Sequence, residues 1–226
     1  MRISTFIAVY NAERYVASAI ESVLAQTLPA HEVIVVDDGS TDGTGEVLRR
    51  FGSKIRCLSQ QNSGPARALN AAMAVSAGDA FAFLDCDDLW TPEKLEIQSA
   101  TLASDPNLEA VFAYAQQFVS PDLDPEIARK YVVPDRPQPG IHKNTLLIRR
   151  EAFERIGRFD ESLKASDFVE WYARASVLGL RWRMLKQVVT LRRQHPGNAG
   201  RRLRSKQHEE ILWSLKSSLD KMRPLR

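Results

Sequence analysis

The stretch AFAFLDCDD (residues 80–88) joins an apolar run to three carboxylates within four positions. The run 80–84 contains no polar residue and predicts a buried β-strand that ends in an acidic loop. Neighbouring carboxylates repel one another, and a hard divalent cation such as Mg²⁺ or Mn²⁺ removes the repulsion while substrate phosphates complete its coordination shell. The alternative is a plain turn before a helix, where Asp is favoured in any case. A second acidic strand end at Asp37-Asp38 favours the cation site.

Predicted strands and helices alternate on both sides of this stretch. The predicted strands cover residues 3–9, 32–36, 55–59 and 80–84. The predicted helices cover about residues 16–24, 41–51, 65–75 and 92–104, the last of them capped by Thr91. This alternation predicts an α/β protein with a parallel sheet covered by helices on both faces. In such sheets ligands bind at the carboxyl ends of the strands, so the two acidic strand ends are the candidate sites.

The second half of the chain has a less regular pattern. Residues 120–140 carry five prolines and few apolar residues, which indicates a long loop or flap. We then expect strands at 145–148 and 188–191 and helices at 151–156 and 167–178. From about residue 203, apolar residues recur at helical spacing and predict a C-terminal amphipathic helix. We expect one domain over residues 1–200, followed by a basic helical tail over 201–226.

The composition is that of a soluble globular protein, with 44% hydrophobic and 26% charged residues. A formal net charge of +3 is too small to indicate a nucleic-acid partner. No apolar run is long enough to span a membrane and no signal-peptide pattern is present, so we expect a cytoplasmic protein. Cys57 lies in an apolar run and is predicted to be a small core residue.

Basic residues gather before and within the predicted tail. They are Arg192, Arg193, Arg201, Arg202, Arg204 and Lys206. Together with an amphipathic helix they could rest on an anionic membrane surface, which would make the protein peripheral at the inner face of the cell membrane. A homodimer contact and a helix packed on the domain are the alternatives, and the sequence leaves all three open.

Five segments, in their order and spacing, resemble the family 2 glycosyltransferases over about residues 3–167. Each segment is unspecific by itself, but the ordered set is specific. The segments are YNAE (10–13), SVLAQT (22–27), VVDDGSTD (35–42), NSGPAR (62–67) with Asn70, and FLDCDD (83–88). The resemblance implies the GT-A fold, in which a Rossmann-like, mostly parallel sheet is flanked by helices.

The resemblance also implies an activity. It is the inverting, metal-dependent transfer of a sugar from a nucleoside-diphosphate sugar, most often a UDP-sugar, to an acceptor hydroxyl. The acceptor would be a carbohydrate or a lipid-linked molecule in bacterial cell-surface polysaccharide or glycolipid synthesis. The donor-binding half would cover residues 1–118 and the acceptor-binding half 119–200.

Residue roles follow from the same resemblance. Asp38 should contact the nucleotide base, and Asp85 and Asp87 should carry Mn²⁺ or Mg²⁺ and the diphosphate, with Asp87 the firmer ligand. Asp88 starts the following turn and supports the loop. The remaining donor contacts are expected at Tyr10, Asn11, Glu13, Arg67, Cys86 and His195, with Cys86 a spacer rather than a metal ligand.

The family supplies its general base as an Asp near the start of a helix that follows a Phe-Asp-Glu segment. Here FDE (159–161) is followed by Asp167, which the resemblance identifies as the base, with Glu170 as the reserve. The alternative is that Asp167 only caps the helix. Ser166 stands where the family usually has an acid.

His195 and the tryptophans each have two interpretations. The imidazole of His195 could ligate the metal, or the residue could belong to a solvated basic loop. Trp171, Trp182 and Trp213 could stack on a sugar ring, but tryptophans at helical spacing are more often core.

Two other functions remain open. One is a catalytically silent nucleotide-sugar binder, although the carboxylates at 85, 87 and 167 are all present. The other is a nucleotidyltransferase, which more typically has a Gly-rich phosphate loop after the first strand. Residues 9–12 (VYNA) do not provide such a loop.

Overall fold

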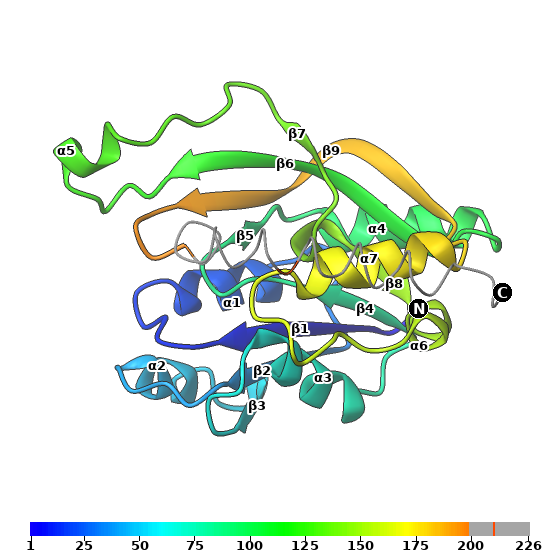
Figure 1. Cartoon of the computed structure of the whole chain (residues 1–226), viewed down its shortest axis with the longest axis horizontal. Helices are drawn as coiled ribbons and strands as arrows, with labels where there is room; N and C mark the ends of the chain where they lie inside the picture. The colour runs from blue at the N-terminus through cyan, green and yellow to red at the C-terminus, as the bar shows by residue number, and fades with distance from the viewer. Residues whose placement is uncertain (199–209, 211–226) are drawn as a thin grey trace, which may run out of the picture.

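The computed structural model describes residues 1–198 and Glu210 and has an α/β fold (Figure 1). In this part of the chain a single sheet of nine strands runs in the order β3-β2-β1-β4-β8-β6-β9-β5, and β7 pairs with β6. None of the helices in the described residues is both long and apolar enough for a membrane span. The predicted basic tail over 201–226, its amphipathic helix and Trp213 lie outside the described residues, apart from Glu210.

The first half of the sheet is parallel, as the sequence predicts. Its strands are β1 (Ile3–Val9), β2 (Glu32–Asp37), β3 (Arg56–Ser59) and β4 (Ala80–Phe83). They alternate with α1 (Val16–Leu24), α2 (Thr44–Arg49), η1 (Gly52–Lys54) and α3 (Pro65–Ala74). Val9 lies opposite Asp37, and Phe6 lies opposite Phe83. The loops that follow β1, β2 and β4 therefore meet at one edge of the sheet.

The second half of the sheet is mixed, so the parallel pattern indicated by the alternation in the first half does not continue beyond β4. β8 (Leu147–Arg149) lies antiparallel between β4 and β6 (Ala110–Val119). β9 (Trp182–Gln194) runs parallel to β6, while β5 (Leu89–Trp90) and β7 (Gln138–Gly140) pair antiparallel to β9 and β6. The other elements are α4 (Lys94–Ser104), α5 (Pro125–Ala128), η2 (Lys143–Thr145), α6 (Arg150–Ile156) and α7 (Asp167–Val177).

Two apolar layers hold the helices on opposite faces of the sheet. Neighbouring strand residues point to opposite faces, so Phe6 joins one layer and Ile7 the other. The first layer packs α3, α6 and α7, and the second packs α1, α2 and α4. Trp171 is fully buried in the first layer and stacks on Phe153 at a ring distance of 5.2 Å. It is a core residue, and burying such a side chain contributes about 1.5–3 kcal/mol.

Several element boundaries differ from those predicted. The helix expected at 41–51 is only α2, Thr44–Arg49, and α4 begins at Lys94 without a side-chain cap, so the prediction of Thr91 as its cap is wrong. The strand expected at 188–191 is part of the much longer β9. Residues 120–140, expected to be a loop, include α5, which lies away from the body of the molecule, and β7, which pairs with β6 (Figure 1).

Cys57 is exposed, so its prediction as a core residue is wrong. It lies on β3, which is the edge strand next to β2. All four β3 residues are exposed or only partly buried. The apolar run around Cys57 therefore reflects a strand at the border of the sheet rather than in its centre.

Candidate active site

The acidic loop 85–88 follows β4 at the carboxyl edge of the sheet, and Asp88 is its buried anchor. Its carboxylate is 4% exposed and accepts hydrogen bonds from the Asn144 amide at 2.5 Å and from the Arg193 backbone N–H at 2.8 Å. Burial raises the pKa of Asp88 well above its usual range, and the charges of Asp87 and Asp85 raise it further. Asp88 therefore supports the loop, as expected.

Asp85 is held by Asn144 on both its backbone and its side chain. The Asp85 N–H donates to Asn144 Oδ1 at 3.1 Å, and Asn144 Nδ2 donates to Asp85 Oδ2 at 3.0 Å. Much of the residue is open to solvent, yet the surrounding protein and the charge of Asp87 raise the pKa of its carboxyl, against the opposing effect of Lys143. Asn144 lies in a segment without a readable motif, so the sequence did not predict this contact.

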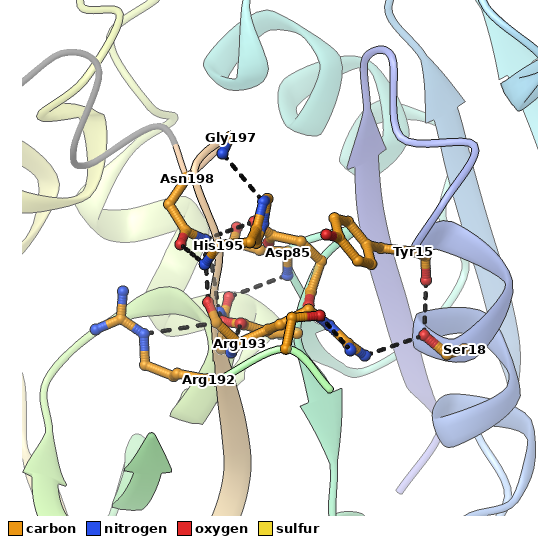
Figure 2. Close-up of polar contacts among 12 residues, drawn as sticks. Tyr15, Ser18, Asp85, Arg192, Arg193, His195, Gly197 and Asn198 are labelled. Carbon is orange, nitrogen blue, oxygen red and sulfur yellow. Dashed lines mark hydrogen bonds and ion pairs between the residues drawn. The ribbon is translucent and has the colours of Figure 1, made fainter. Parts of the chain in front are cut away.

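Asp87 is held by two residues that follow the end of β9. Its Oδ2 lies 2.9 Å from His195 Nε2 and 3.1 Å from Asn198 Nδ2. Figure 2 shows His195 and Asn198 next to each other. His195 is 7% exposed and packs on Tyr15 at a ring distance of 4.5 Å, so it does not belong to a solvated loop. Because His195 Nδ1 accepts from the Gly197 N–H, the geometry assigns the ring proton to Nε2, which donates to Asp87. In this tautomer the imidazole orients Asp87.

Arg193 fixes the backbone of the same loop from inside the protein. Its Nε donates to the Asp87 carbonyl oxygen at 2.9 Å, and its guanidinium lies 5.0 Å from the Tyr15 ring and 4.9 Å from the Phe118 ring. Arg192 points elsewhere and is more open, with Nε 3.9 Å from Asp88 Oδ2 (Figure 2). The two neighbouring arginines therefore have different surroundings, and only Arg192 is open to a ligand.

Cys86 lies between Asp85, which is exposed, and Asp87, which is partly buried. Burial raises the pKa of its thiol well above the usual range, and the charges of Asp87 and Asp85 add to the shift. A thiol with a raised pKa is a poor metal ligand, because thiolates are the form that binds metals. The geometry agrees with the interpretation of Cys86 as a spacer.

Asp38 organises the loop that follows β3. Its carboxylate is 3% exposed and accepts from Gln60 Nε2 at 2.7 Å and from the N–H groups of Ser63 and Gly64 at 2.9 and 2.8 Å. A carboxylate offers about four lone-pair positions, so these three donors leave one unused. Gly39 beside it has φ +77°, and a Cβ there would lie 2.9 Å from the Asn62 backbone nitrogen, so the turn requires glycine.

The segment YNAE (10–13) holds the loop that follows β2. Asn11 Oδ1 accepts from the Thr41 N–H at 2.8 Å, and Glu13 Oε2 accepts from the Gly43 N–H at 2.6 Å. Tyr10, by contrast, is 48% exposed and open to a ligand. Arg67 on α3 is also exposed, and its side chain makes no hydrogen bond or ion pair with the residues that the structure describes. The structure brings these residues to the same edge, with Asn11 and Glu13 engaged in the scaffold.

Asp167 is the first residue of α7 and is buried, with 7% of its side chain exposed. Its Oδ2 accepts from Lys143 Nζ at 2.7 Å, and the helix has Ser166 at its cap position without a side-chain cap bond. Asp167 is thus not the cap of α7. The reserve candidate Glu170 is paired with Arg174 on the same helix at 2.8 Å. Lys143 is a site residue that the sequence analysis missed.

The turn before Asp167 is tied to distant parts of the chain. Glu210 accepts from the N–H groups of residues 164–166 at 2.9–3.0 Å and from Ser166 Oγ at 2.8 Å. These hydrogen bonds outweigh burial and lower the pKa of Glu210. Lys164 Nζ donates to the Ser63 carbonyl oxygen at 2.7 Å, which links this turn to the Asp38 loop.

Asn70, from the fourth motif, makes two hydrogen bonds with the Phe159 backbone. Its Nδ2 donates to the Phe159 carbonyl oxygen at 2.9 Å, and its Oδ1 accepts from the Phe159 N–H at 3.2 Å.

Known proteins share both the sequence pattern and the fold. The family model described as Glycosyl transferase family 2 matches residues 4–157. The chain belongs to this family. An uncharacterised glycosyltransferase of Rickettsia typhi is 36% identical over 183 residues, which are 75% of this chain and 57% of that protein. The Escherichia coli UDP-Glc:alpha-D-GlcNAc-diphosphoundecaprenol beta-1,3-glucosyltransferase WfaP is 32% identical over 123 residues, 54% of this chain and 48% of that protein.

Solved structures identify the GT-A fold predicted from the sequence. The mannosyltransferase PcManGT from Pyrobaculum calidifontis, in complex with GDP-Man and Mn²⁺, superposes with a TM-score of 0.70 at 20% identity. The match covers all of this chain and 66% of the PcManGT chain. Residues 1–349 of S. aureus TarS, in complex with UDP-GlcNAc, have a TM-score of 0.68 at 21% identity over 88% of this chain and 60% of that one. The matches span 31% to 57% of the length of the curated relatives from Nostoc and Rickettsia typhi.

The residues at the acidic loop fit a hard divalent cation. Within residues 1–198 and at Glu210, no group of three or more His, Cys, Asp or Glu side chains is arranged to hold a metal ion. Mg²⁺ and Mn²⁺ sites with substrate phosphates need only one or two protein carboxylates. Asp85 and Asp87 supply oxygen donors of that kind, and each is already oriented by an amide or imidazole donor.

Proposed function

We propose that this chain is an inverting glycosyltransferase that moves one sugar from a nucleoside-diphosphate sugar to an acceptor hydroxyl. One observation carries the proposal: η2 joins the two halves of the reaction. Its Lys143 binds Asp167, and its Asn144 binds Asp85 and Asp88. A carboxylate suited to accept a proton is thereby connected through two adjacent residues to a loop suited to hold a diphosphate.

Asp167 is proposed as the general base of a single displacement. Its carboxylate takes the proton of the acceptor hydroxyl while the acceptor oxygen forms a bond to the anomeric carbon of the donor. The bond from that carbon to the diphosphate oxygen breaks, and the nucleoside diphosphate leaves with the electron pair. The carbon is attacked from the side opposite the leaving group, so the configuration inverts.

Donor binding is proposed for the rest of the carboxyl edge. A Mn²⁺ or Mg²⁺ ion at Asp85 and Asp87 would neutralise charge on the departing diphosphate. The free lone pair of Asp38 is suited to a base N–H, while Tyr10 and Arg67 are exposed at the same edge for the base and the diphosphate. Asn11, Glu13, Cys86 and His195 would act by shaping the loops that hold the donor.

We propose a UDP-sugar as the donor and a cell-surface polysaccharide or glycolipid pathway as the setting. Support comes from relatives: the E. coli enzyme is named for a UDP-Glc donor and a diphosphoundecaprenol-linked acceptor, and a Bacillus subtilis relative is a putative teichuronic acid biosynthesis glycosyltransferase. A cytoplasmic location, with the basic tail 201–226 on the membrane or in a homodimer, is consistent with such an acceptor and belongs to the same proposal.

Calorimetric titration of UDP with and without Mn²⁺ tests the donor site. We expect binding that needs Mn²⁺, and we expect Asp87→Asn to weaken it by at least about tenfold because it removes the firmer ligand charge. Asp105→Asn, which changes an exposed carboxylate paired with Arg183, is the matched control and should bind as the wild type does. Equal binding of UDP without a metal, or by Asp87→Asn, would contradict the proposed site.

A further inference from the structure

Lys143 contacts Asp167, the proposed base, and its charge also interacts with that of Asp85 in the proposed metal loop. Its Nζ is 2.7 Å from Asp167 Oδ2, and the two side chains are 13% and 7% exposed. Burial opposes the charged ammonium, yet the carboxylates of Asp167 and Asp85 together raise the pKa of Lys143. The lysine therefore carries its positive charge inside the site, beside the base and within electrostatic reach of the metal loop.

The backbone that carries Lys143 is fixed from several directions. The carbonyl oxygen of Asn144 accepts from Trp90 Nε1 at 2.9 Å and from Thr190 Oγ1 at 2.8 Å. The carbonyl oxygen of Thr145 accepts from Gln98 Nε2 at 2.7 Å. Strands β5 and β9 and helix α4 thus hold η2 in place. Because η2 is held in place and the Lys143 side chain is only 13% exposed, the fold restricts where the ammonium can lie.

The two oxygens of Asp167 are not equivalent in this arrangement. Lys143 occupies Oδ2, whereas Oδ1 makes no hydrogen bond with any residue that the structure describes. A buried carboxylate needs a charged or hydrogen-bonding partner, and a fixed partner on one oxygen also fixes the direction of the other. A general base must present its oxygen within hydrogen-bond reach of the proton that it takes.

We infer that Lys143 is a positioning residue for Asp167, which holds Oδ2 so that Oδ1 faces the acceptor hydroxyl. The inference rests on the proposed function, because it needs Asp167 to be the base. Lys143 acts through the carboxylate and does not bind the donor diphosphate. It therefore governs the rate of transfer from the bound donor and leaves donor affinity unchanged.

Three variants test the inference by comparing kcat for sugar transfer with the Kd for UDP and Mn²⁺. Lys143→Met removes the ammonium and keeps the bulk of the stem. We expect it to lower kcat at least about thirtyfold while the Kd changes less than about threefold, since misplacement of a catalytic group by 1 Å can cost on the order of a hundredfold. Lys143→Arg keeps the charge and should retain at least about tenfold more kcat than Lys143→Met.

Arg155→Met is the matched control for the loss of an ion pair. Arg155 pairs with Glu109 at 2.8 Å, outside the candidate site, so this variant removes a cation without touching the reaction. It should keep the wild-type kcat, and the UDP affinity of each variant shows that it is folded. A loss of kcat in Arg155→Met equal to that in Lys143→Met would assign the effect to stability and overturn the inference.

The remaining outcomes separate this inference from the proposed function. If Lys143→Met transfers sugar at the wild-type rate while Asp167→Asn is inactive, the inference is wrong and the proposed function stands. If Lys143→Met weakens UDP binding by the same factor as it lowers kcat/KM, Lys143 binds the donor and the inference is also wrong. If the wild type binds UDP and transfers no sugar, the proposed function fails, and the inference fails with it.

Discussion

Asp38 has a structural role, and we propose a binding role for the same side chain. Its carboxylate satisfies the N–H groups of Ser63 and Gly64, which would otherwise lie unpaired next to the core at the start of α3. Buried polar groups that lose their partner cost about 1–3 kcal/mol each. In the proposed site, the contacts that make the loop rigid would also fix the direction of the lone pair that accepts a ligand N–H.

Asp38→Ala should therefore weaken both the fold and the donor site. We expect the free energy of unfolding to fall by about 2–4 kcal/mol, because the hydrogen bonds to a charged acceptor are lost, and UDP affinity to fall with it. Chemical denaturation and calorimetry measure the two effects. Asp105→Ala, at an exposed pair, should stay within about 1 kcal/mol of the wild type. Wild-type UDP affinity in Asp38→Ala would exclude Asp38 from the site.

Lys94 is a buried lysine that the proposed reaction does not use. It is 0% exposed, and its ammonium donates to Gln98 Oε1 and lies 4.7 Å from the Trp90 ring centre, without an ion-pair partner among the described residues. Burial lowers the pKa of Lys94 well below its usual range. In the unfolded chain the same group binds a proton up to about pH 10.4, so between the two pKa values the unfolded state binds more protons than the folded state.

This difference predicts that stability rises with pH in the neutral to alkaline range. For Lys94 alone the slope approaches about 1.4 kcal/mol per pH unit between the folded and unfolded pKa values. Urea unfolding at pH 7, 8 and 9 should show that the wild type gains stability relative to Lys94→Met over this range. Lys186→Met, at an exposed position on β9, should follow the wild-type curve. Parallel curves for the wild type and Lys94→Met would contradict the lowered pKa.

The strands and helices of this fold differ in how well local sequence patterns predict their position and their role. β1, β2 and β4 are short runs buried on both faces, so local patterns predict their position and the sites at their ends. β6 was not predicted. β9 was predicted only in part, because exposed and buried residues are mixed along it and its pairing with β6 shifts register. The turn η2 has three residues and no motif. Its role depends on contacts with Asp85 and Asp88, which precede Asn144 in the chain by 59 and 56 positions.

Asn144 is the residue of η2 through which this element acts on the acidic loop. Asn144→Ala removes the donors to Asp85 and Asp88 and the acceptor for the Asp85 N–H. Loss of an outer partner of a metal ligand typically costs 10–100-fold in metal affinity, so we expect Mn²⁺-dependent UDP affinity to fall by about tenfold or more. A titration of Mn²⁺ at fixed UDP measures this. An unchanged Mn²⁺ dependence would show that Asn144 does not position the loop.

At the scale of the whole molecule, the two halves of the sheet differ in how well local sequence patterns predict them. Its parallel half carries the five ordered motifs, so local patterns predicted its strands and the edge at which the candidate donor residues lie. Its mixed half brings β9, η2 and α7 to that edge through contacts between residues far apart in the chain, which no local pattern specifies. The contacts of Lys143, Asn144 and Asn198 were not predicted for that reason, whereas Asp167 was proposed only through the family resemblance.

The central claim is that donor binding and proton removal reside on separate carboxylates. A transfer assay with wild type and Asp167→Asn, together with calorimetry of UDP and Mn²⁺, tests it most directly. We predict that Asp167→Asn lowers kcat by about 10²–10⁴-fold, the usual contribution of a general base, and that it binds UDP as the wild type does. Wild-type turnover by Asp167→Asn, in a variant that still binds UDP, would contradict the account.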